Sequence, residues 1–204
     1  MLSEEQIHRY SRQILLGRVG GVGQQRLLAL GAQAVGQGPA LPMAIAYLGA
    51  GGTSVRAQNG SVAPGDEGFL FVPGDVGHRR DVRLDRALRE MNPDATGSGL
   101  PGCLLHFPGE FSGPGPWVGI GRKEGRLALV YRSERGCLAC FAALSEHFGA
   151  DEASPISNLA GCLAALVFQR LCLGLSADLG GLWIDPACRM TPMDIRPCPS
   201  CESP

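Results

Sequence analysis

The sequence predicts an α/β fold: a Rossmann-like sheet with flanking helices, preceded by an N-terminal helical extension and closed by a four-cysteine zinc knuckle. Three observations predict it. Short apolar strands alternate with apolar helices in the first half of the chain, which is the pattern of a parallel sheet with crossover helices. Helix-start signals stand before the first of these strands. Two Cys-x-x-Cys pairs lie far apart in the second half.

The N-terminal extension begins with a capping box. Ser3 is followed three residues later by Gln6, and Glu4 and Glu5 suit the positive end of a helix dipole. This pattern predicts one helix over residues 3–16 that ends at Gly17. The glycine-rich residues 20–23 are interpreted as a flexible link, and a second helix is expected over 24–30.

A βαβ unit follows the N-terminal helices. It consists of a strand over 32–35, a loop over 36–42, an apolar helix over 43–48 and a strand over 53–57. Residues 58–74 resemble a loop. A helix is then expected between residues 75 and 91, because Leu84, Leu88 and Met91 share one helical face, and Asn92-Pro93 ends it.

The second half alternates strands with two further helices. A hairpin is expected around the turn Lys123-Glu124-Gly125, and a long apolar helix is expected to lie at the centre of the core. The predicted strands are a short one near 104–105, the hairpin pair 117–120 and 126–131, and two short ones at 182–184 and 193–195. The predicted helices cover residues 141–148 and 156–173.

Composition bounds the class of protein. The chain has 204 residues, of which 45% are hydrophobic and 18% are charged, so a single domain with one real core is expected. A net charge of -1 gives no electrostatic footprint for nucleic acid or for a membrane surface. No apolar run reaches the ~20 residues that span a bilayer. The N-terminus lacks a signal peptide, so a cytoplasmic protein with reduced thiols is expected.

The two cysteine pairs have the spacing of a structural zinc site. Each pair presents two thiolates from a tight turn, and two such turns complete a tetrahedron around one Zn²⁺. The alternative is two unrelated pairs of free or redox-active thiols, although a redox pair usually stands alone at a helix N-terminus. The predicted ligands are Cys137, Cys140, Cys198 and Cys201.

Several segments together resemble the ThiF/MoeB family, relatives of the ubiquitin-activating enzymes. The segment Arg9-Tyr10-Ser11-Arg12-Gln13-Ile14-Leu15 is similar to the family's opening R-Y-[SN]-R-Q-I-L motif, and Met91-Asn92-Pro93-Asp94 is similar to its L-N-P segment. The expected hairpin and the two cysteine pairs match its strand pair and zinc knuckle. The resemblance implies a ThiF/MoeB-type sheet. It also implies adenylation of the C-terminal glycine of a ubiquitin-like or sulfur-carrier protein, with ATP and Mg²⁺.

The nucleotide loop departs from the family pattern. The family has G-x-G-G-x-G, in which backbone N–H groups approach the phosphates. Here only Gly36 and Gly38 remain. Pro39 removes a donor, and Ala40 and Leu41 bring side chains where close approach is required. The loop is therefore interpreted as a packing turn.

Four other parts of the family's machinery have no match. Residues 56–60 lack the ribose-binding carboxylate, and residues 65–70 lack the phosphate-binding arginine. The C-T-D-N motif that supplies a Mg²⁺ ligand has no counterpart, and residues 149–155 lack a cysteine. Arg80 stands near a family lysine, but Arg79 and Arg80 are interpreted as charges on a solvated helix face. Bound ATP and Mg²⁺ are therefore not expected.

These departures favour a non-catalytic subunit, a pseudoenzyme. The single domain then divides into N-terminal helices (1–30), a degenerate nucleotide-binding half (31–95) and a zinc-bearing half (96–204). The expected partner is a second copy or an active ThiF/MoeB-like paralogue, together with a ubiquitin-like or sulfur-carrier protein. In the family, the first helix passes an arginine into the neighbouring subunit's nucleotide site. Arg12 occupies that position here, and Tyr10 and Ile14 are expected to supply the apolar contact.

Three alternatives remain open at this point. Arg12 is equally well interpreted as a solvated charge on an amphipathic helix. The chain as a whole is alternatively a divergent adenylyltransferase, or a peptide-recognition subunit of a peptide-modifying complex. Nucleotide binding and pyrophosphate exchange distinguish the enzyme from the other two.

Overall fold

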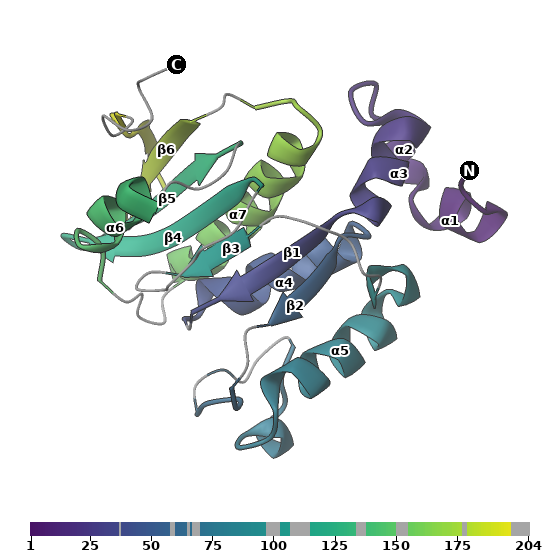
Figure 1. Cartoon of the computed structure of the whole chain (residues 1–204), viewed down its shortest axis with the longest axis horizontal. Helices are drawn as coiled ribbons and strands as arrows, with labels where there is room; N and C mark the ends of the chain where they lie inside the picture. Colours follow the sequence, from purple (N-terminus) through teal and green to yellow (C-terminus); the bar gives the residue numbers. More distant parts are fainter. Residues whose placement is uncertain are drawn as a thin grey trace.

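A seven-stranded mixed sheet forms the centre of the part of the chain that the computed structural model describes (Figure 1). The strand order is β2-β1-β3-β4-β5-β6-β7. The first four strands are parallel, and each later neighbour pairs antiparallel. The strands are β1 (Gly31–Val35), β2 (Ser54–Ala57), β3 (Cys103–His106), β4 (Trp117–Lys123), β5 (Arg126–Arg132), β6 (Leu179–Ile184) and β7 (Met190–Pro192). The described residues are 1–36, 38–57, 60–64, 66, 70–96, 103–106, 115–133, 138–149, 155–176 and 179–196.

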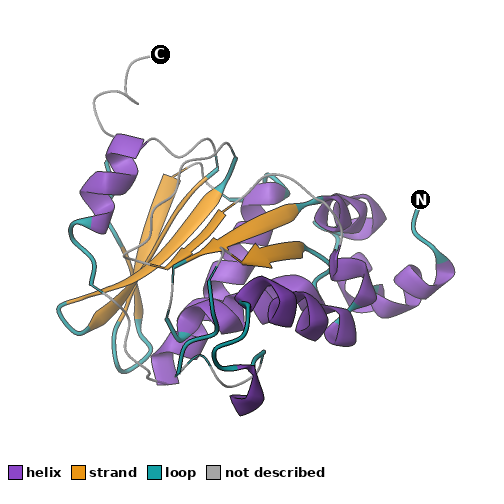
Figure 2. Ribbon diagram, turned by 60° about the horizontal axis from the view of Figure 1, so that its bottom comes forward, coloured by secondary structure: helices purple, strands orange, loops and turns teal. Residues whose placement is uncertain are grey.

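The helices surround this sheet unequally. In Figure 1, α4 and α7 lie behind the strands, α5 lies alongside β2, and the N-terminal helices extend beyond the sheet. In Figure 2, α6 lies at the left, apart from the other helices. The helices are α1 (Glu4–Arg9), α2 (Ser11–Ile14), α3 (Gly20–Ala29), α4 (Ala40–Ala50), α5 (Arg80–Met91), α6 (Leu138–Ser145) and α7 (Pro155–Cys172), with short 3₁₀ turns at Pro73–Asp75 and Pro93–Thr96.

The main core lies between the sheet and the α4–α7 layer. Alternate residues of β4 and β5, including Ile120 and Leu129, are fully buried there beneath α7. On α7, Ala164 and Phe168 are 0% exposed, so the expected central helix is confirmed. By its length and composition alone, this helix could cross a membrane. Its inner face, however, is part of the core.

The opposite face of β4 and β5 holds a second, smaller cluster. Trp117, Ala128 and Val130 alternate with the main-core residues and pack with Phe148. The partly buried residues Leu144, Trp183, Met193 and Ile195 complete this cluster. The sheet therefore has apolar contacts on both faces, as the Rossmann-like prediction requires.

The N-terminal prediction is confirmed at its start and wrong in its continuity. Ser3 and Gln6 form the expected capping box. The single helix over 3–16 is instead two helices, α1 and α2, separated by Tyr10, which turns inward and is 1% exposed. The expected glycine link is wrong as well. Residues 20–23 form the first turn of α3, where Gly23 packs closely against Val19 and Leu173.

Most of the later elements are confirmed with shifted ends. Helix α4 begins at Ala40 because Pro39, with φ -68°, is already set for a helix start. The hairpin turn forms as predicted, with positive φ at Glu124 (52°) and Gly125 (77°). Helix α6 begins at Leu138, three residues before the predicted start.

The last predicted strand is wrong in position. Strand β7 comprises Met190–Pro192, and the predicted segment 193–195 follows it. Met193 and Ile195 instead direct their side chains into the second cluster. Packing against the sheet face therefore outweighs the strand pattern of this segment.

Candidate functional site

The carboxyl ends of β1 and β2 form the candidate nucleotide site, where open α/β sheets bind their ligands. The loop after β1 turns at Gly36 (φ 94°) and Gly38 (φ 151°), conformations that favour glycine. Pro39 then stands at the N-cap of α4 with no side-chain cap. The loop thus has the position of a phosphate-binding loop, but one backbone donor is missing from it.

Arg80 occupies this site from the first turn of α5. Its Nη1 donates a hydrogen bond to the Gly36 carbonyl oxygen at 3.2 Å, and its Nη2 forms an ion pair with Asp66. Both side chains are only 12% exposed. The interpretation of Arg80 as a solvated charge is therefore wrong. For Arg79 it is right, because that side chain is 74% exposed and pairs with Asp81.

Little space remains around the Arg80 guanidinium. The cavity in the described part of the site is about 10 Å³, enough for roughly one water molecule. Arg80 Nε is buried without a hydrogen-bond partner among the described atoms, so such a water has a donor to accept from. The cavity is lined by Ala34, Gly38, Leu41, Pro42, Ile45, Ala57, Asp66, Phe71 and Arg80.

Asp66 is a site residue that the sequence reasoning missed. It pairs with Arg80 and accepts a hydrogen bond from the Ala63 N–H at 2.8 Å. It lies in a loop, where no periodicity indicates which way a side chain points. The only available signal is its charge, opposite to that of Arg80.

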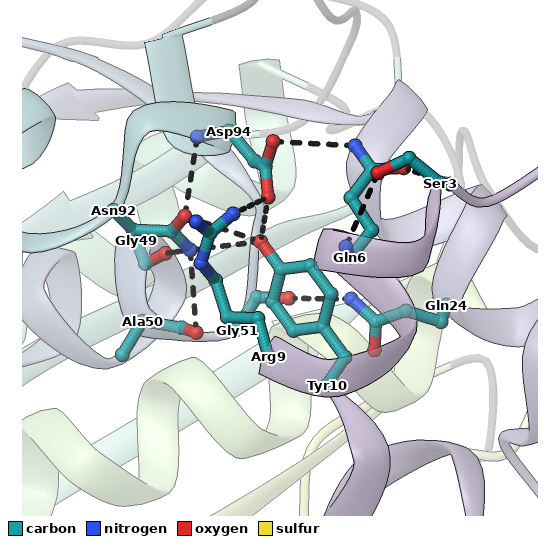
Figure 3. Close-up of polar contacts among 10 residues, drawn as sticks. All are labelled: Ser3, Gln6, Arg9, Tyr10, Gln24, Gly49, Ala50, Gly51, Asn92 and Asp94. Carbon is teal, nitrogen blue, oxygen red and sulfur yellow. Dashed lines mark hydrogen bonds and ion pairs between the residues drawn. The ribbon is translucent and has the colours of Figure 1, made fainter.

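A second polar cluster joins the Arg9-Tyr10 segment near the N-terminus to the Asn92-Pro93-Asp94 segment (Figure 3). Tyr10 Oη accepts a hydrogen bond from Asn92 Nδ2 at 2.9 Å and donates to Asp94 Oδ2 at 3.0 Å. Asn92 Nδ2 also donates to the Gly49 carbonyl oxygen at 2.8 Å. Arg9 forms an ion pair with Asp94, and Gln6 Nε2 donates to that carboxylate at 3.2 Å. We call Arg9, Tyr10, Asn92 and Asp94 the N-terminal polar cluster.

The surroundings of this cluster shift two pKa values. Burial opposes ionisation of Asp94, but the hydrogen bonds from Gln6, Tyr10 and Arg9 outweigh it, so the pKa of Asp94 lies below its ordinary value. Burial raises the pKa of Tyr10. At neutral pH the cluster is therefore a carboxylate held by a guanidinium and a neutral phenol.

The cluster corrects the expected role of Tyr10. Its side chain is buried within its own chain, close to Gly52, and so offers no apolar contact to a neighbouring subunit. Arg12 follows it on α2 with an exposed side chain and with no hydrogen bond or ion pair to a described residue. Ile14 is partly buried. The structure thus fixes the segment that carries Arg12 and leaves Arg12 itself exposed.

The predicted zinc ligands fall mainly outside the described residues. Cys137, Cys198 and Cys201 are among the residues that are not described, and the described ranges contain no group of three or more metal-binding side chains. Cys140 lies on α6, with Arg132 Nη1 3.7 Å from its Sγ. Leu144 on α6 and Ile195, close before Cys198, pack in the same cluster. Helix α6 and the residues just before the second pair therefore lie on the same face of the sheet.

Solved structures share this fold at low sequence identity. E. coli MccB with ATP gives a TM-score of 0.69 at 16% identity, over 95% of this chain and 73% of that chain. The microcin C7 biosynthetic enzyme MccB with N-formylated MccA gives 0.69 at 16% identity, over 95% and 74%. PaaA gives 0.72 at 15% identity, over 96% and 85%. No protein-family model and no curated protein sequence matches the chain. The likeness supports a ThiF/MoeB-like fold.

Proposed function

We propose that this chain is a non-catalytic, ThiF/MoeB-like subunit. It dimerises with itself or with an active paralogue and serves a ubiquitin-like or sulfur-carrier protein system. The observation that carries the proposal is the occupied candidate nucleotide site. Arg80 fills the space beside the Gly36 turn and is held there by Asp66 and by the Gly36 carbonyl oxygen.

Charge and hydrogen bonding both oppose a triphosphate in this site. The Asp66 carboxylate already pairs with the Arg80 guanidinium, the one guanidinium among the described residues that line the cavity. This carboxylate would also repel phosphate oxygens. Pro39 offers no N–H at the start of α4. In the described part of the site, a nucleotide would therefore compete with the Arg80–Asp66 pair and meet a cavity of only about 10 Å³.

Calorimetry with Mg-ATP tests the proposal directly. The intact chain is expected to release no binding heat and to catalyse no ATP–pyrophosphate exchange with a candidate carrier protein. Three polar contacts of the family are lost: a backbone donor at Pro39, the ribose-binding carboxylate and the Mg²⁺-binding aspartate. At about 1–3 kcal/mol each, their loss weakens nucleotide binding by a hundredfold or more. A micromolar dissociation constant together with exchange by the chain alone would instead establish a divergent adenylyltransferase.

Arg12 is the proposed link to the active partner. The N-terminal polar cluster fixes its helix on the body of the protein, and the side chain is free to reach a phosphate of a neighbouring subunit. In the heterodimer, Arg12→Ala is expected to preserve assembly and to slow the partner's adenylation by a factor of ~10². Arg18→Ala, which changes an exposed arginine outside the motif, is the matched control. Unchanged exchange with Arg12→Ala would make Arg12 a surface charge.

A second candidate function is a peptide-recognition subunit of a peptide-modifying complex. It is favoured by the likeness to the microcin C7 biosynthetic enzyme MccB in complex with MccA. Pull-down with a peptide substrate of a neighbouring modification enzyme separates the two candidates. Specific capture of the peptide without any effect on pyrophosphate exchange would favour the second one.

We also propose that Cys137, Cys140, Cys198 and Cys201 bind one structural Zn²⁺. Four cysteine thiolates are a donor set that zinc prefers, and a closed site of this kind supplies folding energy rather than chemistry. The packing of Leu144 and Ile195 against the second cluster supports this assignment, because it places α6 and the residues before the second pair on the same face of the sheet.

A further inference from the structure

Arg132 lies at the end of β5, and its side chain belongs to the face of the sheet on which α6 lies. Side chains of a strand alternate between its two faces. Ala128 and Val130 belong to the second cluster, whereas Leu127 and Leu129 belong to the main core. Arg132 follows Val130 at the same spacing, so its side chain projects toward α6.

Cys140 meets this arginine from the helix above the sheet. It stands in the first turn of α6, four residues before Leu144, which packs against the second cluster. Residues four apart share one face of a helix, so Cys140 also lies on the side of α6 that faces the sheet. Arg132 Nη1 donates a hydrogen bond to Cys140 Sγ at 3.7 Å, and this contact is partly buried.

We propose that Arg132 is a positioning residue of the zinc site. The proposal rests on the assignment of Zn²⁺ to the two cysteine pairs, in which Cys140 is a ligand. Four thiolates exceed the charge of one Zn²⁺ by two, and the guanidinium beside Cys140 offsets part of that excess. The N–H group also orients the sulfur, as hydrogen-bond partners of metal ligands commonly do. Partial burial makes the attraction stronger than it would be in bulk water.

Arg126 is the matched comparison for Arg132. It stands at the other end of β5, six residues earlier and so on the same face of the sheet. Its guanidinium lies 4.6 Å from the centroid of the Trp183 ring and pairs with Glu124 at 3.7 Å. At about 3.4 Å per residue, the two arginines are about 20 Å apart along the strand. Arg126→Met therefore removes the same charge from the same strand and leaves the contact with Cys140 in place.

Competition for Zn²⁺ between the intact chain and a chromophoric chelator, at neutral pH under reducing conditions, tests the proposal. Arg132→Met is expected to weaken zinc affinity by about 10- to 100-fold. Arg132→Lys retains a charged donor and should recover most of that loss, and Arg126→Met should bind zinc as the wild type does. Circular dichroism verifies that each variant is folded, and Arg132→Gln replaces a methionine variant that does not fold.

Substitution of Co²⁺ for Zn²⁺ adds a readout that general destabilisation does not move. A hydrogen bond stabilises the sulfur lone pairs, so Arg132→Met should shift the sulfur-to-cobalt charge-transfer band to lower energy. Wild-type affinity in Arg132→Met would overturn the role of Arg132 and leave the zinc site standing. An equal loss in Arg126→Met, or a loss without a band shift, would also overturn that role. A wild-type chain that binds no Zn²⁺ would overturn the zinc assignment and this proposal with it.

Discussion

Asn92 is the residue that connects most of the N-terminal polar cluster. It is 2% exposed, and its amide binds Tyr10 Oη and the Gly49 carbonyl oxygen. Its Oδ1 accepts a hydrogen bond from the Asp94 N–H at 3.1 Å. The side chain thus joins the N-terminal helices, the end of α4 and the turn after α5. The resemblance to the family's L-N-P segment gave no reason for this asparagine, whereas its contacts do.

Asn92→Ala is expected to lower the free energy of unfolding by about 2–4 kcal/mol, because several buried groups then lose their hydrogen-bond partner. Tyr10→Phe should cost less, since it keeps the buried ring and removes only the hydroxyl. Urea denaturation measures both changes. Arg89→Ala, on the exposed face of α5, is the control and should stay within about 0.5 kcal/mol of the wild type. Equal stability of Asn92→Ala and Arg89→Ala would contradict the structural role of the cluster.

Asp94 makes the same cluster sensitive to acid. Its pKa in the folded protein lies below the ordinary 3.8, so the folded state binds a proton less readily than the unfolded chain does. The ionised carboxylate therefore stabilises the fold above that ordinary value, and this contribution is lost as the pH falls from there through the lowered pKa. The wild type should exceed Asp94→Asn in unfolding free energy at neutral pH. The difference should shrink below a pH of about 4. A difference that is constant from neutral to acidic pH would show that ionisation of Asp94 is not involved.

At the scale of elements, the contact between α4 and α7 depends on glycine. Gly161 lies against the Ala40 carbonyl oxygen and Met43 Cβ, with no room for a methyl group. The sequence marks α7 as a buried helix but does not indicate which of its residues faces α4. Only the packing of the two helices against each other singles out Gly161.

A matched pair of glycine substitutions tests this contact. Gly161→Ala is expected to destabilise the protein by about 1–3 kcal/mol through overpacking, despite its higher helix propensity. Gly21→Ala, in α3 with no atom within 4 Å of the new Cβ, is expected to stabilise it by about 0.4–1 kcal/mol. Urea midpoints of the two variants should therefore move in opposite directions. Stabilisation by both substitutions would show that α7 can move away from α4 at little cost.

At the scale of the whole molecule, the proposed zinc site ties the chain's C-terminal segment to α6. Cys198→Ser is expected to release the metal and to lower the melting temperature, because closure of the site contributes several kcal/mol to folding. Elemental analysis and thermal unfolding measure the two effects. Cys188→Ser changes an exposed cysteine on the turn between β6 and β7 and should affect neither. Zinc-free protein after a metal-replete purification would contradict the assignment.

The order of helices and strands along the chain was largely predictable wherever it depends on local signals. The βαβ unit, the hairpin at Glu124-Gly125, the capping box at Ser3 and the long apolar helix follow from turn chemistry, capping and periodicity. These signals need only neighbouring residues. Element ends were less accurate, as at α4 and β7, because packing outweighs propensity there.

Tertiary structure alone decided the features that join distant residues. Tyr10 and Asn92 are 82 positions apart, and no pattern in the sequence pairs them. The Arg80–Asp66 pair links a helix to a loop, so periodicity does not predict it. Arg80, expected as a surface charge, is instead one half of a partly buried ion pair. The sequence by itself determined the helices and strands, and the differences between the loop after β1 and the family's nucleotide loop. The arrangement of the helices and strands in space determined which side chain occupies the candidate nucleotide site, because the pairing of Arg80 with Asp66 depends on contacts that only the packed chain creates.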